Sequence, residues 1–175
     1  ELEVHRAESF DDITELPNLE ILNVRGEQIV NIEGIGKLKK LKQLYIWGEC
    51  DEGLESIGNL TSLESLLIFG YENADFTFLG NLTNLKELSL WSYQMQDISW
   101  IEKLTKLREL ELRGNDKLSD ITPLRYLTNL EILNLSECRI SDISPLSELK
   151  KLKKLELWNN RIKDITPLRG LTRLE

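Results

Sequence analysis

Residues 134–172 read NLSECRISDISPLSELKKLKKLELWNNRIKDITPLRGLT, and the closing motif Asp-Ile, Ser or Thr, Pro and Leu occurs in this stretch twice. Between the two copies the leucines follow the frame Leu-x-x-Leu-x-x-Leu-x-Leu. Aligned on this frame, the chain divides into units that start at Leu16, Leu38, Leu60, Leu82, Leu104, Leu127 and Leu149. The starts are 22 residues apart, except that the unit from Leu104 has 23. A constant period of this length predicts a repeat architecture.

Partial units flank the full ones. A shortened unit precedes Leu16 and contains Leu2, Val4, Phe10 and Ile13, and another is cut off after Leu171. No single unit can bury its leucines alone, so stacked units must form the core. We therefore expect one domain over residues 1–175, with seven full repeats, and expect it to be a fragment of a longer protein.

The composition limits the partners of the chain. Of its 175 residues 41% are hydrophobic, which suffices for one folded domain, and its net charge is −8. An excess of acid argues against nucleic acid and against anionic membranes, whose phosphates attract Lys and Arg. No apolar run has the length of a membrane span, so we expect no membrane insertion.

Each unit predicts its own local structure. Short strands such as 88–90 and 155–157 alternate apolar and variable residues, as a strand with one buried face does. In the Ser-Pro and Thr-Pro pairs, the hydroxyl residue suits an N-cap and the proline the first helical position. One aspartate recurs at the same position of successive units: Asp97, Asp120, Asp142 and Asp164. We expect this column of aspartates to form turn hydrogen bonds rather than to bind calcium. Apolar residues should fill the convex side: Ile98, Ile101, Ile121, Leu124, Ile143, Leu146, Ile165 and Leu168.

The stretch quoted above resembles the leucine-rich repeat family, most closely its bacterial internalin type, and the resemblance extends over essentially the whole chain. It implies a right-handed solenoid with a parallel β-sheet on the concave face and 3₁₀ or short helical turns on the convex face. It also implies a module that recognises a protein ligand through the concave face, on a bacterial protein that is secreted or lies on the cell surface.

Two other functions stay open. Residues 29–44, IVNIEGIGKLKKLKQL, are similar to phosphatase-regulatory repeats, which implies an intracellular, cytoplasmic scaffold or regulatory subunit. The repeats could also serve as a structural spacer in a larger surface protein. Self-association through the ends of the repeat stack or through aromatic residues is a further interaction that the pattern allows.

The sequence predicts neither catalysis nor metal binding for this chain. His5 is the only histidine, so neither a Ser–His–Asp or Cys–His set nor a zinc site can be assembled around it. We expect no enzyme, no cofactor and no metal. Cys50 and Cys138 lie four units apart, roughly 19 Å at the spacing of neighbouring strands, so both thiols should be free.

Aromatic residues gather on the predicted concave face. In each unit, the residue between the two core positions of the strand and the residue after them should face the concave solvent side. In neighbouring units these positions bring large side chains together, with glutamates (Glu87, Glu109, Glu111) beside them. Exposed aromatic patches usually mark recognition surfaces, although the rings could merely stack across the strands. The expected partner-binding residues are Tyr45, Trp47, Leu67, Phe69, Tyr71, Trp91, Tyr93 and Arg113.

One position differs between early and late units. The later units carry Asn115, Cys138 and Asn160 at this position, which follows the strand. We call it the asparagine slot, because a small side chain there forms hydrogen bonds to backbone groups of adjacent turns. The early units carry Glu27, Glu49, Tyr71 and Tyr93. These are too large for a buried slot, so the sequence predicts that the early loops follow a different path and point these side chains outward.

Overall fold

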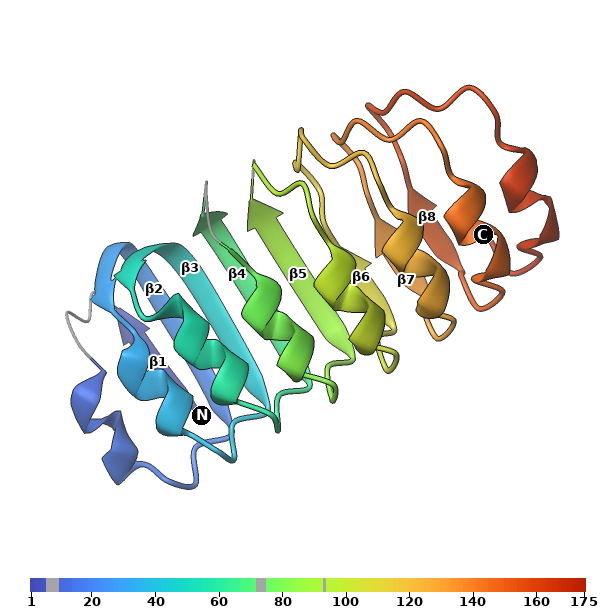
Figure 1. The fold of residues 1–175 in the computed structure, drawn as a ribbon. Coiled ribbons are helices and arrows are strands. Elements are labelled where there is room, and N and C mark those ends of the chain that lie inside the picture. The colour runs from blue at the N-terminus through green and yellow to red at the C-terminus, as the bar shows by residue number, and fades with distance from the viewer. Residues whose placement is uncertain (6–9, 72–74, 93) are drawn as a thin grey trace.

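The structure is a computed structural model that describes residues 1–5, 10–71, 75–92 and 94–175. Within these ranges, parallel strands form a sheet of eight (Figure 1). They are β1 (Leu2–His5), β2 (Ile21–Asn31), β3 (Gln43–Glu52), β4 (Ser65–Tyr71), β5 (Glu87–Ser92), β6 (Glu109–Glu111), β7 (Ile132–Asn134) and β8 (Lys154–Glu156). One 3₁₀ helix follows each strand: η1 (Asp11–Glu15), η2 (Glu33–Lys37), η3 (Leu54–Asn59), η4 (Thr77–Asn81), η5 (Ser99–Lys103), η6 (Thr122–Tyr126), η7 (Ser144–Glu148) and η8 (Thr166–Gly170).

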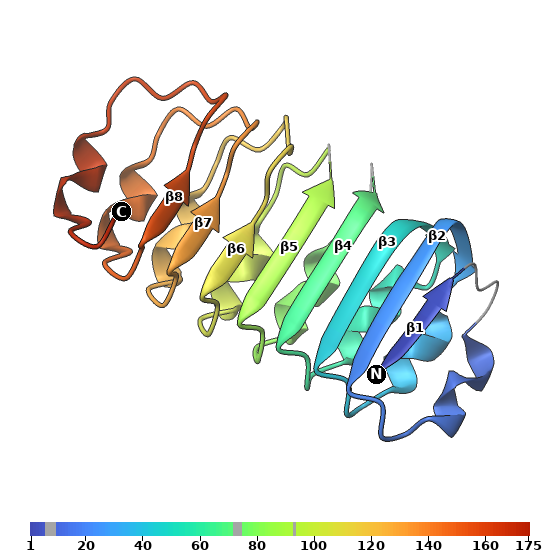
Figure 2. The ribbon, with the colours of Figure 1, turned by 180° about the vertical axis from the view of Figure 1, so that it is seen from behind.

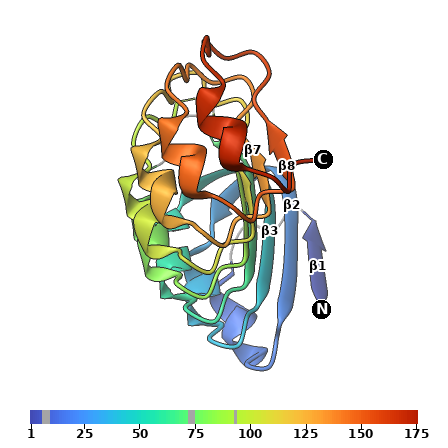
Figure 3. The same cartoon turned by 90° about the vertical axis from the view of Figure 1, so that its right-hand side faces the viewer.

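The arrangement is an open solenoid. Strands neighbour one another in chain order, β1 to β8, and each pair is parallel. The sheet forms one layer and the 3₁₀ helices the other, which is seen from the strand side in Figure 2 and end-on in Figure 3. The two termini lie at opposite ends of the stack (Figure 1). The predicted fold class, a leucine-rich-repeat horseshoe with a parallel sheet and 3₁₀ turns, is therefore confirmed.

The core lies between these two layers. The strand leucines stack in register from unit to unit, as Leu44, Leu66 and Leu88 do, and all three are buried. Most of the predicted convex residues are buried as well. The two exceptions are in the last unit: Leu168 is only half-buried, and Ile165 is 70% exposed, so the predicted burial of Ile165 is wrong. Its equivalents are covered by the 3₁₀ turn of the following unit, and Ile165 lies in the last turn of the stack.

The 3₁₀ helices are capped differently from the prediction. In the Ser-Pro and Thr-Pro units (η6, η7 and η8) the hydroxyl residue is the first residue of the helix, an isoleucine precedes it, and the N-cap side chain makes no capping hydrogen bond. The predicted N-cap role of Ser and Thr is thus wrong. Instead, the aspartate two residues earlier accepts from the first helical N–H, as Asp120 Oδ1 does from Thr122 N over 2.9 Å. The predicted turn hydrogen bonding of the aspartate column is confirmed for Asp97, Asp120, Asp142 and Asp164.

Strand length falls along the chain, from 11 residues in β2 to three in β6, β7 and β8. In the late units the asparagine slot explains the early end of the strand. Asn160 Nδ2 donates to the carbonyls of Leu135 and Leu157, and its Oδ1 accepts from Ile140 N. The amide thereby satisfies backbone groups that have left the sheet, and the chain can turn.

The early units satisfy the same backbone groups in another way. Beyond a bulge after Arg25, β2 and β3 pair again up to Asn31 and Glu52, so the two strands continue through the region that is a turn in later repeats. A different loop path is therefore confirmed for the units of β2 and β3, and Glu49 is exposed as expected. The side chains of Glu27 and Tyr71, and all of Tyr93, lie outside the described residues.

Close strand approach depends on one glycine in particular. Gly48 has φ +127°, a backbone conformation that side chains with a Cβ rarely adopt. A Cβ built on it would lie 1.7 Å from the carbonyl oxygen of Gly26 in β2. Only glycine therefore fits here between the extended strands β2 and β3.

Candidate binding surface on the concave face

Three aromatic rings form a ladder across β3, β4 and β5. Trp47, Phe69 and Trp91 are register partners on these strands, so the sheet itself aligns them. The ring centroids of Trp47 and Phe69 are 5.6 Å apart, and those of Phe69 and Trp91 are 5.3 Å apart. Tilted pairs at this separation attract each other through edge and face contacts. We call these three residues the aromatic ladder.

Arg113 extends the ladder across the next units. Its guanidinium carbon lies 5.7 Å from the ring centroid of Trp91 and 4.7 Å from that of Trp158, within the range of cation–π attraction. Its Nε donates to Oε1 of Glu137 over 2.7 Å, which fixes the guanidinium between the two indoles. Ser136, whose unit lies between those of Arg113 and Trp158, is fully buried.

The exposure of the rings differs from one end to the other. Trp47 is 40% exposed and Trp158 is 49% exposed. Trp91, which the sequence places on open surface, is only half-buried, because Phe69 and Arg113 flank its ring. Its Nε1 is buried and has no hydrogen-bond partner among the described residues.

The remaining predicted residues divide into two groups. Tyr45 and Leu67 are register partners beside the ladder, both half-buried, and the Tyr45 hydroxyl donates to Gln43 Oε1 over 3.2 Å. The side chain of Tyr71 and the whole of Tyr93 lie outside the described residues. The structure thus brings together Tyr45, Trp47, Leu67, Phe69, Trp91 and Arg113.

Trp158 and Glu137 join this surface although the sequence did not single them out. Trp158 stands in the same column as Trp91 and Arg113, but Ser136 interrupts the run of large side chains. The column predicts the common face, whereas the reach of Arg113 across Ser136 depends on side-chain conformation. Glu137 stands at a turn position that gave no sign of facing Arg113.

A row of glutamates borders the ladder. Glu87 and Glu109 are register partners on β5 and β6, and Glu111 lies two residues further along β6 on the same face. All three line a concave groove of about 530 Å³, together with Tyr45, Trp91, Arg113, Asn134, Lys154 and Glu156. We call Glu87, Glu109 and Glu111 the acidic row. The groove combines aromatic surface with negative charge.

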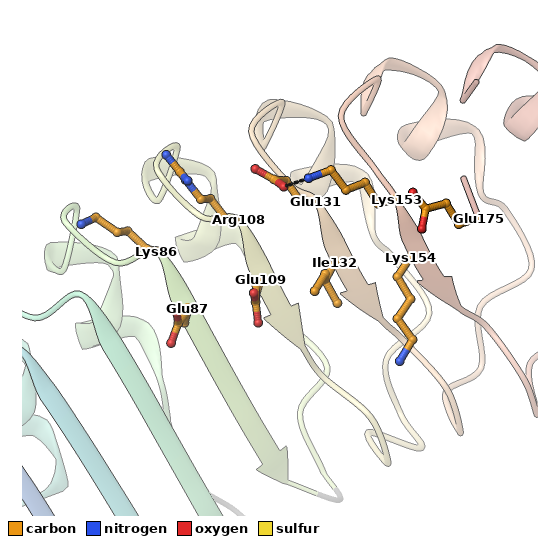
Figure 4. A pocket seen from close by; sticks show the side chains of 9 residues that line it. All are labelled: Lys86, Glu87, Arg108, Glu109, Glu131, Ile132, Lys153, Lys154 and Glu175. Carbon is orange, nitrogen blue, oxygen red and sulfur yellow. Dashed lines mark hydrogen bonds and ion pairs between the residues drawn. The ribbon is translucent and has the colours of Figure 1, made fainter. Parts of the chain in front are cut away.

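The edge at which the strands begin carries its own charges. Three ion pairs link neighbouring repeats there: Glu20–Lys42, Glu64–Lys86 and Glu131–Lys153. The hydrogen bond from the paired lysine lowers the pKa of each of these carboxyl groups. Figure 4 shows this edge, a hollow of about 600 Å³, with Arg108 and Lys86 at the rim and Glu87 and Glu109 on the strands beside it. Each pair joins side chains of neighbouring repeats, and because the pairs are exposed, each contributes little to the free energy of unfolding.

Possible metal ligands and reactive thiols can be located in the described part of the chain. It contains no group of three His, Cys, Asp or Glu side chains that could hold a metal ion. Cys138 is a free, buried thiol in the asparagine slot, with Sγ 3.6 Å from the carbonyl oxygens of Leu112 and Ser136. Burial raises the pKa of this thiol to about 11, which disfavours the reactive thiolate. The predicted free thiol is confirmed for Cys138, and the side chain of Cys50 lies outside the described residues.

No helix within the described ranges has the length and apolar character that a membrane crossing requires.

Family models match most of the chain. The model of a leucine-rich repeat region matches residues 7–130, and the model of leucine-rich repeats in two copies matches residues 128–170. The chain therefore belongs to the leucine-rich repeat family. No curated protein matches it by sequence.

Solved structures refine this assignment. An internalin C2 from Listeria monocytogenes is 32% identical over 96% of this chain and 74% of that protein, with a TM-score of 0.89. Within the family, the chain is thus internalin-like. An internalin InlF from Listeria monocytogenes is 26% identical over 98% of this chain and 57% of that protein, with a TM-score of 0.77. The Arabidopsis receptor kinase HAESA, solved in complex with the peptide hormone IDA and the co-receptor SERK1, is 28% identical over 99% of this chain and 31% of that protein, with a TM-score of 0.82.

Proposed function

We propose that this chain is a protein-recognition module that binds a polypeptide partner on its concave face. The aromatic ladder, continued by Arg113 and Trp158, is the observation that carries the proposal. Trp, Tyr and Arg dominate the binding energy of protein interfaces. Trp and Tyr offer a large contact area with few rotatable bonds, and Arg offers a planar set of hydrogen-bond donors. Here they form one continuous strip across neighbouring repeats.

The alternative is that the rings only stiffen the sheet. Cross-strand aromatic pairs do stabilise a sheet, each by roughly 0.2–1 kcal/mol. Rings that only stabilise the sheet should be buried against their neighbours. The two ends of the strip are not: Trp47 is 40% exposed and Trp158 is 49% exposed. Large rings that stay in contact with water beside a groove favour recognition over a purely structural role.

The relatives support a peptide or protein ligand. HAESA is a repeat protein of similar fold whose structure contains a peptide hormone. The finer assignment, an internalin-like protein secreted by a bacterium or displayed on its surface, is supported by the similarity to the Listeria internalins. An intracellular scaffold and a spacer remain alternatives. Fractionation of the source cells, followed by immunoblotting of the full-length protein, separates the surface location from the intracellular one.

Selection from a displayed library of random dodecapeptides tests the proposal. The wild-type chain should select peptides whose binding is lost in Trp47→Ala, because Trp47 is an exposed end of the ladder. The matched control is Tyr126→Ala, which removes an aromatic side chain of similar exposure, 46%, from the convex helix η6. Peptides that bind Tyr126→Ala but not Trp47→Ala support the concave site. Selected peptides that are indifferent to Trp47 would contradict it.

A further inference from the structure

On the basis of the proposed function, we infer that the partner segment is cationic: it places a Lys or Arg side chain on the acidic row while apolar side chains contact the aromatic ladder. The inference concerns the chemistry of the ligand at the same site.

The acidic row is electrostatically unfavourable in the free protein. Glu87 and Glu109 are opposed on adjacent parallel strands, and both are exposed. Neighbouring strands lie about 4.8 Å apart, so the two carboxylates repel each other. Like charges directly opposite each other destabilise a sheet. The sheet therefore carries a repulsion here that a neutral residue at either position would remove.

Two cations of the concave face form their ion pairs with other carboxylates. Arg113 forms its ion pair with Glu137 over 2.7 Å, and Lys154 forms its pair with Glu156 over 2.6 Å. Within the described part of the chain, the acidic row forms no ion pair of its own. Lys154 also lies within electrostatic reach of Glu111, so Glu87 and Glu109 are the carboxylates left for a cation that the partner supplies.

The groove around the acidic row suits a long cationic side chain. Trp91 and the carboxylates of the acidic row line the same groove of about 530 Å³. A Lys or Arg side chain can pack its methylene groups against a ring and keep its charged end beside carboxylates. Two carboxylates on neighbouring strands also match the donors of a guanidinium. The same negative charge repels nucleic acid and anionic lipid, which leaves a polypeptide as the partner.

Buried polar groups on the same face indicate a surface that is not optimised for stability alone. Trp91 Nε1 and the hydroxyl of the fully buried Ser136 have no hydrogen-bond partner among the described residues. Leaving buried polar groups unpaired costs folding free energy. Trp91 lines the groove beside the opposed glutamates, and Ser136 occupies the column position between Arg113 and Trp158. Proteins commonly retain such local conflicts at functional sites.

The dodecapeptide library again provides the probe. Peptides selected on the wild-type chain, and dependent on Trp47, should be enriched in Lys and Arg relative to the unselected library. A synthetic copy of a selected peptide should bind the double variant Glu87→Gln/Glu109→Gln about fivefold more weakly, the effect expected of an exposed ion pair. Added salt should weaken binding to the wild type more than to this variant.

Two matched variants complete the design. The double variant Glu102→Gln/Glu148→Gln removes the same charge from exposed positions on the convex helices η5 and η7, and should leave peptide affinity unchanged. Reversing the charge in Glu87→Lys/Glu109→Lys should instead select peptides enriched in Asp and Glu. Thermal unfolding by circular dichroism confirms that each variant is folded, and the neutral Glu87→Gln/Glu109→Gln variant should unfold at a higher temperature than the wild type.

The outcomes separate the inference from the proposed function. Peptides that require Trp47 but show no cationic enrichment, or that bind the wild type and Glu87→Gln/Glu109→Gln equally well, overturn the inference and leave the concave site intact. If the selected peptides do not require Trp47, the proposed site itself is wrong. Equal weakening by the convex control variant would show that overall charge, not the acidic row, attracts the peptide.

Discussion

The side chain of Arg113 is fastened to Glu137 of the following repeat by a hydrogen bond of 2.7 Å, and this pair holds the guanidinium between two indole rings. The backbone of Glu137 has φ +59°, in the left-handed region, as does that of Asn159 at the equivalent position of the next unit, with φ +56°. In the preceding unit the equivalent residue is Gly114, also with positive φ. Glycine adopts this conformation without strain, whereas a glutamate in it is strained, and here its carboxylate pairs with Arg113.

The backbone strain of Glu137 leads to a first prediction. In Glu137→Gly, relief of the left-handed strain, about 1 kcal/mol, should roughly offset the lost ion pair, so the free energy of unfolding should change little. Glu137→Gln keeps the strain and loses the charge, and should lower this free energy by up to about 1 kcal/mol. Urea denaturation of both variants measures the difference. A glycine variant less stable than the glutamine variant would contradict the assigned strain.

The faces of β5 provide a second prediction. Leu90 is a fully buried core residue, and Leu90→Ala should lower the free energy of unfolding by roughly 2–5 kcal/mol. Trp91, its neighbour on the opposite face, is half-buried between Phe69 and Arg113, so Trp91→Ala should cost less, about 1–2 kcal/mol. Trp91→Ala should nevertheless weaken peptide binding by about 2 kcal/mol, as central aromatic anchors do. The reverse order of stabilities, measured by urea denaturation, would mean that the strand faces are inverted.

Gly48 gives a third prediction. In Gly48→Ala the new Cβ would meet the Gly26 carbonyl at 1.7 Å, and the backbone would also be strained at φ +127°, so β2 and β3 must separate locally. We expect a loss of about 3 kcal/mol or more in the free energy of unfolding. Gly170→Ala is the matched control, because its Cβ would meet only the flexible end of Lys150 at 2.8 Å. Similar unfolding temperatures for the two alanine variants would argue against the close strand approach.

The aspartate turns make stability depend on pH. Hydrogen bonds from the hydroxyl and the backbone N–H of Thr122 hold the pKa of Asp120 below its ordinary value. Because the pKa of the folded state is lowered, this stabilisation is complete above the unfolded pKa of about 4 and is lost as the pH falls through the folded pKa. Asp120→Asn keeps an oxygen that can accept from Thr122 N but does not titrate. Its free energy of unfolding should therefore decline less below about pH 4 than that of the wild type.

Asp120→Ala serves as the control in that titration, because it removes the acceptor itself and should be less stable than Asp120→Asn at neutral pH. If wild type and Asp120→Asn lose stability in parallel during acidification, the Asp120 turn does not contribute to the pH dependence.

The buried thiol yields the last prediction. With a pKa raised to about 11 and a side chain in the core, Cys138 should react with iodoacetamide very slowly in the folded protein. In denaturant without reductant, both Cys138 and Cys50 should be alkylated, as mass spectrometry of the tryptic peptides would show. A disulfide that links the two would contradict the four-unit separation and, with it, the alignment of the repeats.

The repeat period, and with it the set of side chains that share a face, could be predicted from the order of the residues alone. Each unit adds one strand in parallel register, so positions 22 residues apart, such as Trp47 and Phe69, become neighbours without any knowledge of loops. The burial of the strand leucines and the column of turn aspartates follow from the same periodicity. This inference works because contacts in a solenoid connect each unit only to the next.

The contacts of individual side chains and backbone groups within each repeat became clear only from the three-dimensional structure. Arg113 reaches Trp158 past Ser136 because a long side chain can span a small one, which depends on conformation and on the bond to Glu137. The extended pairing of β2 with β3 was also not predicted from the sequence. A missing asparagine shows that a turn is unsupported, but backbone groups can be satisfied in several ways, and here the neighbouring strand satisfies them.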